Sequence, residues 1–451
     1  MARASSEAWE RTGAARRIGG ARLTGRGRAF LLLAVALGLV GFGIGNAIFL
    51  ITAFLLGALV LVSRILMHRR VLDLEATRSF SPSLVTAGLT TEATVVITNR
   101  SRSASASALW SDALPWGTGA TAQQRLPALV AHRERYSNPG NRASFRYELR
   151  PPRRGIFAIG PLRVVTGDPF GLAIGAVSLA ATDSLVVAPV VTDLSGRGMP
   201  LESGSGDSRV IERASSGGDD DLMTREYRRG DALRRVHWRA SARHGELMVR
   251  QEEQRTRPEV RLLFDSRADG YRDVATAAAD PRSTATESDS FEWIVQMVAS
   301  IGIHLESSGF AVSTLESTGA RFTRSIDGRG EIVQLRLLES LAAVRLTHRE
   351  GPTPGGERSE GDASSAPVFA VLCSPSPEVR DWVLSQRRPY ERGTVILLAT
   401  GLPMMRELLD PDAPSTRAIF EQAGWQCIEA EPTDDQTAVW HSVAMGAHVR
   451  S

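Results

Sequence analysis

The feature that most constrains this chain is an uncharged, largely apolar run of 34 residues, from Ala29 to Val62. At a rise of about 1.5 Å per residue, one helix of this length would extend about 50 Å, whereas a bilayer core is about 30 Å thick and needs roughly 20 residues. The run is also far longer than the apolar region of a signal peptide. Between Gly41 and Asn46, three glycines and an asparagine supply turn chemistry. We therefore predict two transmembrane helices within residues 29–67, separated by a turn.

Basic residues flank this hairpin on both sides. Residues 1–28 hold seven arginines and two glutamates, and Arg64, His68, Arg69 and Arg70 follow the run. Because cytoplasmic flanks carry an excess of basic residues, both ends are expected in the cytoplasm, with 1–28 as a basic cytoplasmic arm. The chain is thus predicted to be a multi-pass protein of the cytoplasmic membrane with its soluble domains on the cytoplasmic side. The alternative, one tilted span, places the second basic cluster and everything after it outside.

Residues 71–195 have the pattern of short β-strands. The segment ASFRYELR alternates Phe145, Tyr147 and Leu149 with polar residues, which is the two-residue period of a half-buried strand. Glycine and proline separate further short apolar runs, and no long helical period appears. This pattern predicts an all-β, immunoglobulin-like sandwich. Residues 196–221, rich in glycine, serine and aspartate, are predicted to be a linker.

The remaining residues, 222–451, change rhythm. Beyond Arg257, compact apolar runs such as EVRLLFD and RGTVILLAT alternate with helical patterns such as SFEWIVQMVASIGIHLESS. Strand alternating with helix predicts a doubly wound, mostly parallel α/β sheet. Residues 348–367 have the composition of an exposed loop.

The composition excludes several kinds of catalytic site. All 53 basic residues are arginine, so a catalytic lysine, a Schiff base and a phosphate-loop lysine are absent. The sequence has no HExxH or GxSxG motif, and histidines such as His237, His244 and His304 are scattered. Cys373 and Cys427 lie in or beside apolar runs and are expected to pack as small hydrophobic side chains. We therefore predict that the protein is not an enzyme, with an enzyme of a new type as the alternative.

The densest cluster of charge is the segment from Arg225 to Glu253, which contains eight arginines. It is predicted to form a strand, a capped helix and a second strand, because Asp231 is a good N-cap residue and Gly245 a good C-cap residue. Clustered arginine attracts phosphate, but several acidic residues lie close by and no readout motif accompanies them, which argues against nucleic acid.

Arginine is also the preferred partner of carboxylates and aromatic rings. We interpret Arg235 and Trp238 as residues that fix the predicted helix against the sheet domain, so that alanine at either position is expected to lower stability more than binding. Arg228, Arg234 and Arg239 are the candidates for binding a partner.

The spacing within this segment resembles the signature of the bacterial family called domain of unknown function 58. The matching residues are Arg225, Glu226, Tyr227, Gly230, Asp231, Arg235, Trp238, Ser241, Ala242, Arg243, Glu246 and Leu247. Upstream matches are Arg154, Gly155, Gly160, Pro161, Asp168, Pro169, Phe170, Gly171, Leu172 and Pro189.

The resemblance implies a two-span anchor, a β-sandwich and a von Willebrand factor A-like domain. It also implies partners: an AAA+ ATPase of the MoxR type and a transglutaminase-like membrane protein. No activity is established for the family, so the resemblance supplies no reaction. We predict a membrane-anchored, non-catalytic scaffold or adaptor that mediates protein–protein interactions.

A von Willebrand A-like domain raises the question of Mg²⁺, a hard cation that prefers oxygen ligands. The adhesion-site pattern of that fold is Asp-x-Ser-x-Ser, and this chain has Asp265, Ser266, Arg267 and Asp269 at the corresponding strand end. The arginine stands where the first serine should be, and Thr400 stands where a later aspartate is usual. Asp265, Ser266 and Asp269 are therefore only weak metal candidates. A Mg²⁺-dependent ligand-binding module and an arginine-driven nucleic-acid binder are the two alternative functions.

Overall fold

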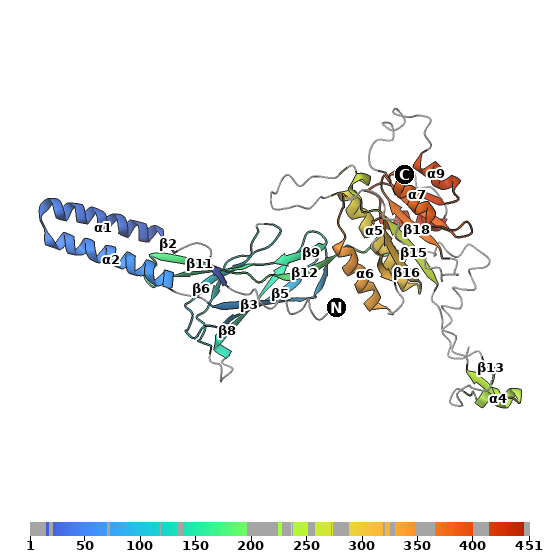
Figure 1. Ribbon diagram of the computed structural model, residues 1–451, viewed down its shortest axis with the longest axis horizontal. Coiled ribbons are helices and arrows are strands. Elements are labelled where there is room, and N and C mark those ends of the chain that lie inside the picture. Colours follow the sequence, from blue (N-terminus) through green and yellow to red (C-terminus); the bar gives the residue numbers. More distant parts are fainter. Residues whose placement is uncertain are drawn as a thin grey trace. The chain divides into compact units, whose positions relative to one another are not determined.

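The computed structural model describes residues 15–17, 21–69, 73–117, 119–132, 139–195, 224–227, 236, 238–250, 258–271, 273, 288–318, 321–324, 330–348, 366–399 and 415–445. The chain divides into an N-terminal unit, Met1–Ala188, and a C-terminal unit, Pro189–Ser451 (Figure 1). The predicted linker 196–221 and most of the predicted loop 348–367 lie outside the described residues.

A helical hairpin formed by α1 (Gly25–Ile44) and α2 (Ala47–Arg69) begins the N-terminal unit. The predicted break is confirmed: α1 ends at Gly45, whose φ of 71° suits glycine, and the Asn46 side chain accepts a hydrogen bond from the second residue of α2 at 2.9 Å. A Cβ at Gly41 would lie 2.8 Å from an α2 side chain, so this glycine permits the close approach of the two helices. Both helices are long and apolar enough to cross a bilayer.

The rest of the N-terminal unit is sheet-rich, as predicted. One sheet has the order β3–β5–β8, a second has β1–β11–β10–β6–β7 with β2 also on β11, and a third has β4–β12–β9. The strand bounds are β3 Leu74–Ser81, β4 Leu84–Thr86, β5 Thr91–Asn99, β6 Ala108–Asp112, β7 Gln124–Leu126, β8 Arg142–Leu149, β9 Gly155–Ile159, β10 Leu162–Gly167, β11 Ala173–Leu179 and β12 Asp183–Ala188. A 3-10 turn, Pro139–Asn141, precedes β8.

Two-residue periodicity builds the core of these sheets. Val95 and Ile97 on β5 face Trp110 on β6 and the aliphatic side chains of β10 and β11, so the first two sheets share one apolar core. The Trp110 ring lies 5.0 Å from Phe145 and 6.1 Å from Tyr147, measured between centroids. These are the β8 residues whose alternation predicted the strand.

A buried ionic network crosses this unit. Nε and Nη2 of Arg78 donate to the two carboxylate oxygens of Asp112, each at 2.7 Å, and neither side chain is exposed. Nη1 donates to Asp183 at 2.9 Å and to the Ala181 carbonyl at 3.1 Å, while the Tyr147 hydroxyl donates to Asp112 at 2.7 Å. Burial lowers the pKa of Arg78, but its hydrogen bonds and attraction to Asp112 and Asp183 raise it further, so the group stays charged.

Two short strands lie where the sequence predicted only a basic arm. β1 (Ala15–Arg17) and β2 (Arg22–Leu23) both pair antiparallel with β11. The predicted basic arm over residues 1–28 therefore contains two short strands that extend the sheet at the edge of β11.

The C-terminal unit contains a six-stranded sheet of order β17–β16–β15–β18–β19–β20. All neighbours are parallel except β17, which pairs antiparallel with β16. The bounds are β15 Glu259–Phe264, β16 Ala311–Glu316, β17 Arg321–Arg324, β18 Val368–Leu372, β19 Gly393–Leu398 and β20 Gln426–Ala430. The predicted mostly parallel sheet is thus present, and the antiparallel edge strand β17 was not predicted.

Helices cover both faces of this sheet. Helices α5 and α6, together with α10, pack on one set of strand residues, whereas α7 and α9 pack on the alternate set. Their bounds are α5 Asp289–Ser307, α6 Glu331–Ala343, α7 Pro377–Ser385, α9 Thr416–Gln422 and α10 Gln436–Met445, and a 3-10 turn spans Ala268–Gly270. Leu194 also packs in this core, so the division between the units falls after Ala188 and earlier than the expected residue 195.

The arginine-rich segment forms a β-hairpin with a short helix. Strand β13 (Thr224–Glu226) pairs antiparallel with β14 (Met248–Arg250), and α4 (Trp238–His244) lies between them in the chain. Strand, helix and strand are thus confirmed. The helix is shorter than predicted, because Val236 forms a β-bridge with Val249 and cannot belong to a helix begun at Asp231.

Candidate functional site

The carboxyl ends of β15, β16 and β18 bring the most unusual polar side chains of the C-terminal unit together. The chain runs from β15 to β16 on one side and later returns to β18 on the other, so a topological switch point lies beside β15, the place where ligands bind in open α/β sheets. We call the residues at these strand ends the strand-end cluster: Asp265, Ser266, Arg267, Glu316 and Ser317. Two of the three metal candidates belong to it, and Asp269 lies next to it.

The carboxylates of the strand-end cluster are engaged by hydroxyl groups. Ser317 donates to Asp265, Ser266 donates to Glu316, and the Arg267 backbone N–H donates to Asp265 at 3.1 Å. Burial raises the pKa of Asp265 to about 6, although the hydrogen bonds from Ser317 and Arg267 act in the opposite direction. Burial likewise raises the pKa of Glu316. These two acids are therefore easier to protonate than ordinary carboxyl groups.

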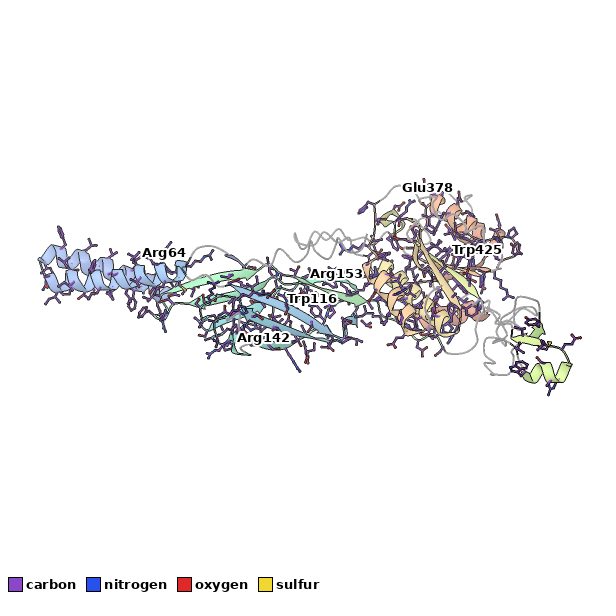
Figure 2. All side chains as sticks on the ribbon, turned by 60° about the horizontal axis from the view of Figure 1, so that its bottom comes forward. Arg64, Trp116, Arg142, Arg153, Glu378 and Trp425 are labelled. Carbon is purple, nitrogen blue, oxygen red and sulfur yellow. The ribbon has the colours of Figure 1, made fainter. Side chains whose placement is uncertain are left out.

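The Arg267 side chain, only 6% exposed, supplies the positive charge at this end of the sheet. Its guanidinium donates to Asp269, to Glu378 at 3.2 Å and to the Ser376 hydroxyl at 3.2 Å. The hydrogen bond to Asp269 is the main reason that the pKa of Arg267 is raised. Figure 2 labels Glu378 on the C-terminal unit. The arginine therefore joins the loop after β15 to the start of α7.

This arrangement does not fit a bound Mg²⁺. The nearly buried guanidinium is a permanent positive charge beside the site, and it already uses both carboxylate oxygens of Asp269. No group of three histidine, cysteine or acidic side chains suited to a metal occurs among the described residues. Thr400 lies outside the described residues.

Other candidate chemical groups of the C-terminal unit have structural roles. The His304 ring packs edge-on against Trp440 with centroids 5.5 Å apart, and burial lowers its pKa. Cys373 and Cys427 are buried in the two apolar cores, and burial raises the pKa of Cys427 to about 12, so neither is a suitable thiolate nucleophile.

The residues of the signature segment are only partly described. Arg225 and Glu226 lie in β13, the Tyr227 N–H donates to the Leu247 carbonyl at 2.8 Å, and the Ser241 hydroxyl accepts from the Met248 N–H at 2.9 Å. Those bonds hold the hairpin and helix together. Arg239 lies in α4, whereas Arg228, Gly230, Asp231, Arg234 and Arg235 lie outside the described residues.

Three side chains of the signature segment are exposed to solvent. Trp238 is 68% exposed, and Arg243 and Leu247 are exposed as well. The role predicted for Trp238, fixing the helix against the sheet domain, stays a prediction; in the described segment its side chain is exposed.

The upstream motif from Asp168 to Leu172 forms the turn between β10 and β11. The two oxygens of Asp168 accept hydrogen bonds from the Phe170 N–H at 3.0 Å and the Ala173 N–H at 2.6 Å, and Gly171 has a φ of 69°. Burial raises the pKa of Asp168, but these backbone donors lower it overall. Pro169 and Phe170 are exposed. We call Asp168–Leu172 the hairpin turn.

The hairpin turn contacts the start of the helical hairpin formed by α1 and α2. The Thr24 hydroxyl donates to the Gly171 carbonyl at 2.7 Å, and the Thr24 N–H donates to the Leu172 carbonyl at 2.9 Å. The same hydroxyl caps α1 by accepting from the Gly27 N–H at 3.0 Å. Sequence reasoning missed this contact; Thr24, an N-cap residue type just before the apolar run, was its one visible signal.

One family model matches part of the chain. Residues 223–352 match the family model described as Protein of unknown function DUF58. The DUF58 match runs from the signature segment through α6 and includes the strand-end cluster, whereas the hairpin turn lies upstream of it. The description assigns no activity. No curated protein matches the chain.

Several solved structures resemble parts of the chain at low sequence identity. The CARDB domain of a Pyrococcus furiosus protein, solved with di-metal ions, is 12% identical, with 26% of this chain and 93% of that chain covered and a TM-score of 0.18. Pseudomonas fluorescens alkylpurine DNA glycosylase AlkC, bound to DNA containing an abasic site analogue, is 13% identical over 34% of this chain and 41% of that chain, with a TM-score of 0.16. Bacillus subtilis sporulation control protein Spo0M is 9% identical over 34% and 57%, with a TM-score of 0.13. TM-scores this low indicate no function for this chain.

Proposed function

We propose that this protein is a membrane-anchored, non-catalytic adaptor that binds another protein through the signature segment. The observation that carries the proposal is the exposure of Trp238. Arg243 and Leu247 in the same segment are also exposed, and the segment matches the DUF58 model. Tryptophan and arginine are the side chains most enriched in the energetic centres of protein interfaces. The exposed indole ring of Trp238 lies on a helix and hairpin that are held by hydrogen bonds, so it is suited to be the centre of such an interface.

The resemblance noted in the sequence supplies the partner classes that we propose. They are an AAA+ ATPase of the MoxR type and a transglutaminase-like membrane protein. The arginines that flank the helices support an orientation with both ends of the membrane hairpin, and hence both units, in the cytoplasm. We also propose that the sheet-rich part is immunoglobulin-like and that the α/β part is a von Willebrand A-like domain in which Arg267 has replaced the cation site. The parallel sheet and the covered faces support this assignment.

Photo-cross-linking in native membranes tests the adaptor proposal. A benzoylphenylalanine at position 238 should cross-link to an AAA+ ATPase or a transglutaminase-like protein, identified by mass spectrometry. Tyr390 is a matched control, because it is also an aromatic side chain with 68% exposure but lies outside the DUF58 match. Cross-links at position 238 no stronger than those at position 390 would count against the proposal. Trp238→Ala should abolish co-purification of the partner, and Tyr390→Ala should leave it unchanged.

A further inference from the structure

The hairpin turn, Asp168–Leu172, meets the start of α1. Exposed basic and apolar side chains lie near this contact. The uncharged run begins at Ala29 and ends at Val62, so the residues just outside it mark where helices α1 and α2 leave the hydrocarbon. The hydrogen bonds from Thr24 to the Gly171 and Leu172 carbonyls hold the hairpin turn at that same level.

The joint is tightly built rather than a chance contact. A Cβ at Gly27 would lie 2.1 Å from the Leu172 carbonyl oxygen, so only glycine allows α1 to pass so close to the turn. From the other helix, α2 packs against β11, the strand that follows the turn. Strand β2 adds backbone pairing to β11 immediately before α1. Both helices therefore contact this part of the sheet, and α1 is hydrogen-bonded to the turn through Thr24.

Positive charge surrounds this joint. Arg22 in β2, Arg26 and Arg28 in the first turn of α1, and Arg64 in α2 are all exposed, and Figure 2 shows Arg64 where the hairpin meets the sheets. The first turn of α1 contains no acidic residue. The carboxylate of the hairpin turn itself, Asp168, is buried and accepts backbone hydrogen bonds, so it does not neutralise this surface.

An apolar side chain completes the surface. Phe170 at the tip of the hairpin turn is 53% exposed, and Ile174 at the start of β11 is also exposed. At the level of lipid headgroups an aromatic ring lies between water and acyl chains, where such rings are favoured, and arginines meet phosphate groups.

We propose that Phe170 and the four arginines form a second membrane contact, in which the hairpin turn docks on a bilayer surface containing anionic phospholipid. This inference rests on the proposed membrane anchoring. Its effect is to hold the sheets of the N-terminal unit against the membrane instead of leaving them on a tether. The partner is a lipid surface rather than a free phosphate, because the exposed ring and the charges occur together beside two spanning helices.

A fluorescent reporter tests the contact in the full chain. Phe170→Cys, labelled with the environment-sensitive NBD dye, is reconstituted into phosphatidylcholine vesicles with and without phosphatidylglycerol. Labelling is directed to the new thiol because Cys373 and Cys427 are buried. Leu89→Cys is the matched control, since Leu89 is 60% exposed and follows β4, in a sheet that does not contain β11. Thermal melting of both labelled variants checks that the fold is retained.

The expected result is quenching of the dye at position 170, but not at position 89, by lipids with a spin label near the headgroup. Spin-labelled phosphatidylglycerol should be enriched at position 170 over spin-labelled phosphatidylcholine, and Arg22→Gln with Arg26→Gln should reduce the enrichment by roughly fivefold per arginine. Flotation with the vesicles after alkaline extraction tests the anchoring itself. A chain that floats but shows no more quenching at position 170 than at position 89 overturns this inference and leaves the anchor intact, whereas a chain that does not float overturns both. Equal quenching by the two lipids overturns the anionic specificity.

Discussion

Replacing Asp112 by asparagine is expected to lower the free energy of unfolding of the N-terminal unit by about 3 kcal/mol. Asp112 accepts two hydrogen bonds from Arg78 and one from the Tyr147 hydroxyl, all at 2.7 Å and within the core. Asparagine has nearly the same shape, so it leaves no cavity. It removes the negative charge and turns an N–H₂ group toward the guanidinium or the phenol, which are both donors.

The magnitude follows from what remains around Arg78. Breaking a buried pair by removing one partner costs about 3–5 kcal/mol, because an uncompensated charge stays behind. Arg78 still has Asp183 at 2.9 Å and the Ala181 carbonyl at 3.1 Å, which places the loss at the lower end of that range. Asp183→Asn is the matched control: the Asp183 side chain is 37% exposed, so water screens its pairing and the expected loss is about 1 kcal/mol or less.

Hydrogen exchange with mass spectrometry measures this effect in the full chain, because peptides from β5 and β6 report on the N-terminal unit alone. A loss of about 3 kcal/mol corresponds to exchange on the order of 100-fold faster for the most protected amides. The reasoning would be refuted by acceleration of less than tenfold in Asp112→Asn, or by equal effects of the two substitutions.

Three further predictions concern other parts of the chain. Gly27→Ala should push α1 away from the hairpin turn and lower the protection of the Thr24 amide at least roughly tenfold in hydrogen exchange, since it breaks a backbone hydrogen bond; Gly25→Ala, which meets nothing within 4 Å, should leave it unchanged. Asp265 has a pKa of about 6 in the folded protein against an ordinary 3.8, so the folded state keeps a proton that the unfolded chain releases, and the contribution of Asp265 to stability falls as pH rises from about 4 to 6. Asp265→Asn lacks this titration. The difference in unfolding free energy between the variant and the original protein should therefore shift in favour of the variant by up to about 3 kcal/mol between about pH 4 and 6, and stay constant above about pH 6. A difference that is the same at every pH would contradict the prediction. Trp238→Ala should change the unfolding free energy by no more than about 0.5 kcal/mol, and a larger loss in a melting experiment would restore the core role that the sequence suggested.

Local sequence patterns predicted most of the helices and strands, because the pattern of apolar residues that indicates each one lies within its own residues. The apolar run and its glycines predicted the two helices and their break at Gly45 and Asn46. Short apolar runs predicted β15, β16, β18, β19 and β20, and the helical period of Ser290–Ser308 predicted α5. Buried strands and amphipathic helices leave such signals even when the partners are unknown.

Contacts between distant segments could not be predicted in the same way. Strand β2 pairs with β11 about 150 residues later, and nothing in its two residues indicates a strand. Val236 has a helical position in the sequence pattern, yet its pairing with Val249 delays the start of α4. In both cases backbone hydrogen bonding to a remote partner outweighed a local preference.

The strand-end cluster shows the same limit for the candidate site. The sequence indicated that Arg267 would oppose a cation beside Asp265 and Asp269, and the geometry agrees. It could not indicate that Glu378 and Ser376, more than 100 residues away, accept hydrogen bonds from the same guanidinium. The arginine and its partner Asp269 are two residues apart in the sequence, whereas its hydrogen bonds to α7 depend on the fold.

Because all 53 basic residues are arginine, every buried basic side chain in the described part of the chain is a guanidinium, apart from histidine. Arg78 reaches two carboxylates and a carbonyl, and Arg267 reaches two carboxylates and a hydroxyl. A planar guanidinium with five donors can satisfy several acceptors in fixed directions, whereas an ammonium group is a compact charge on a flexible stem. In each case the arginine joins segments far apart in the chain, from β3 to β6 and from the end of β15 to the start of α7. At each of these two places one guanidinium organises several acceptors from segments that are far apart in the sequence.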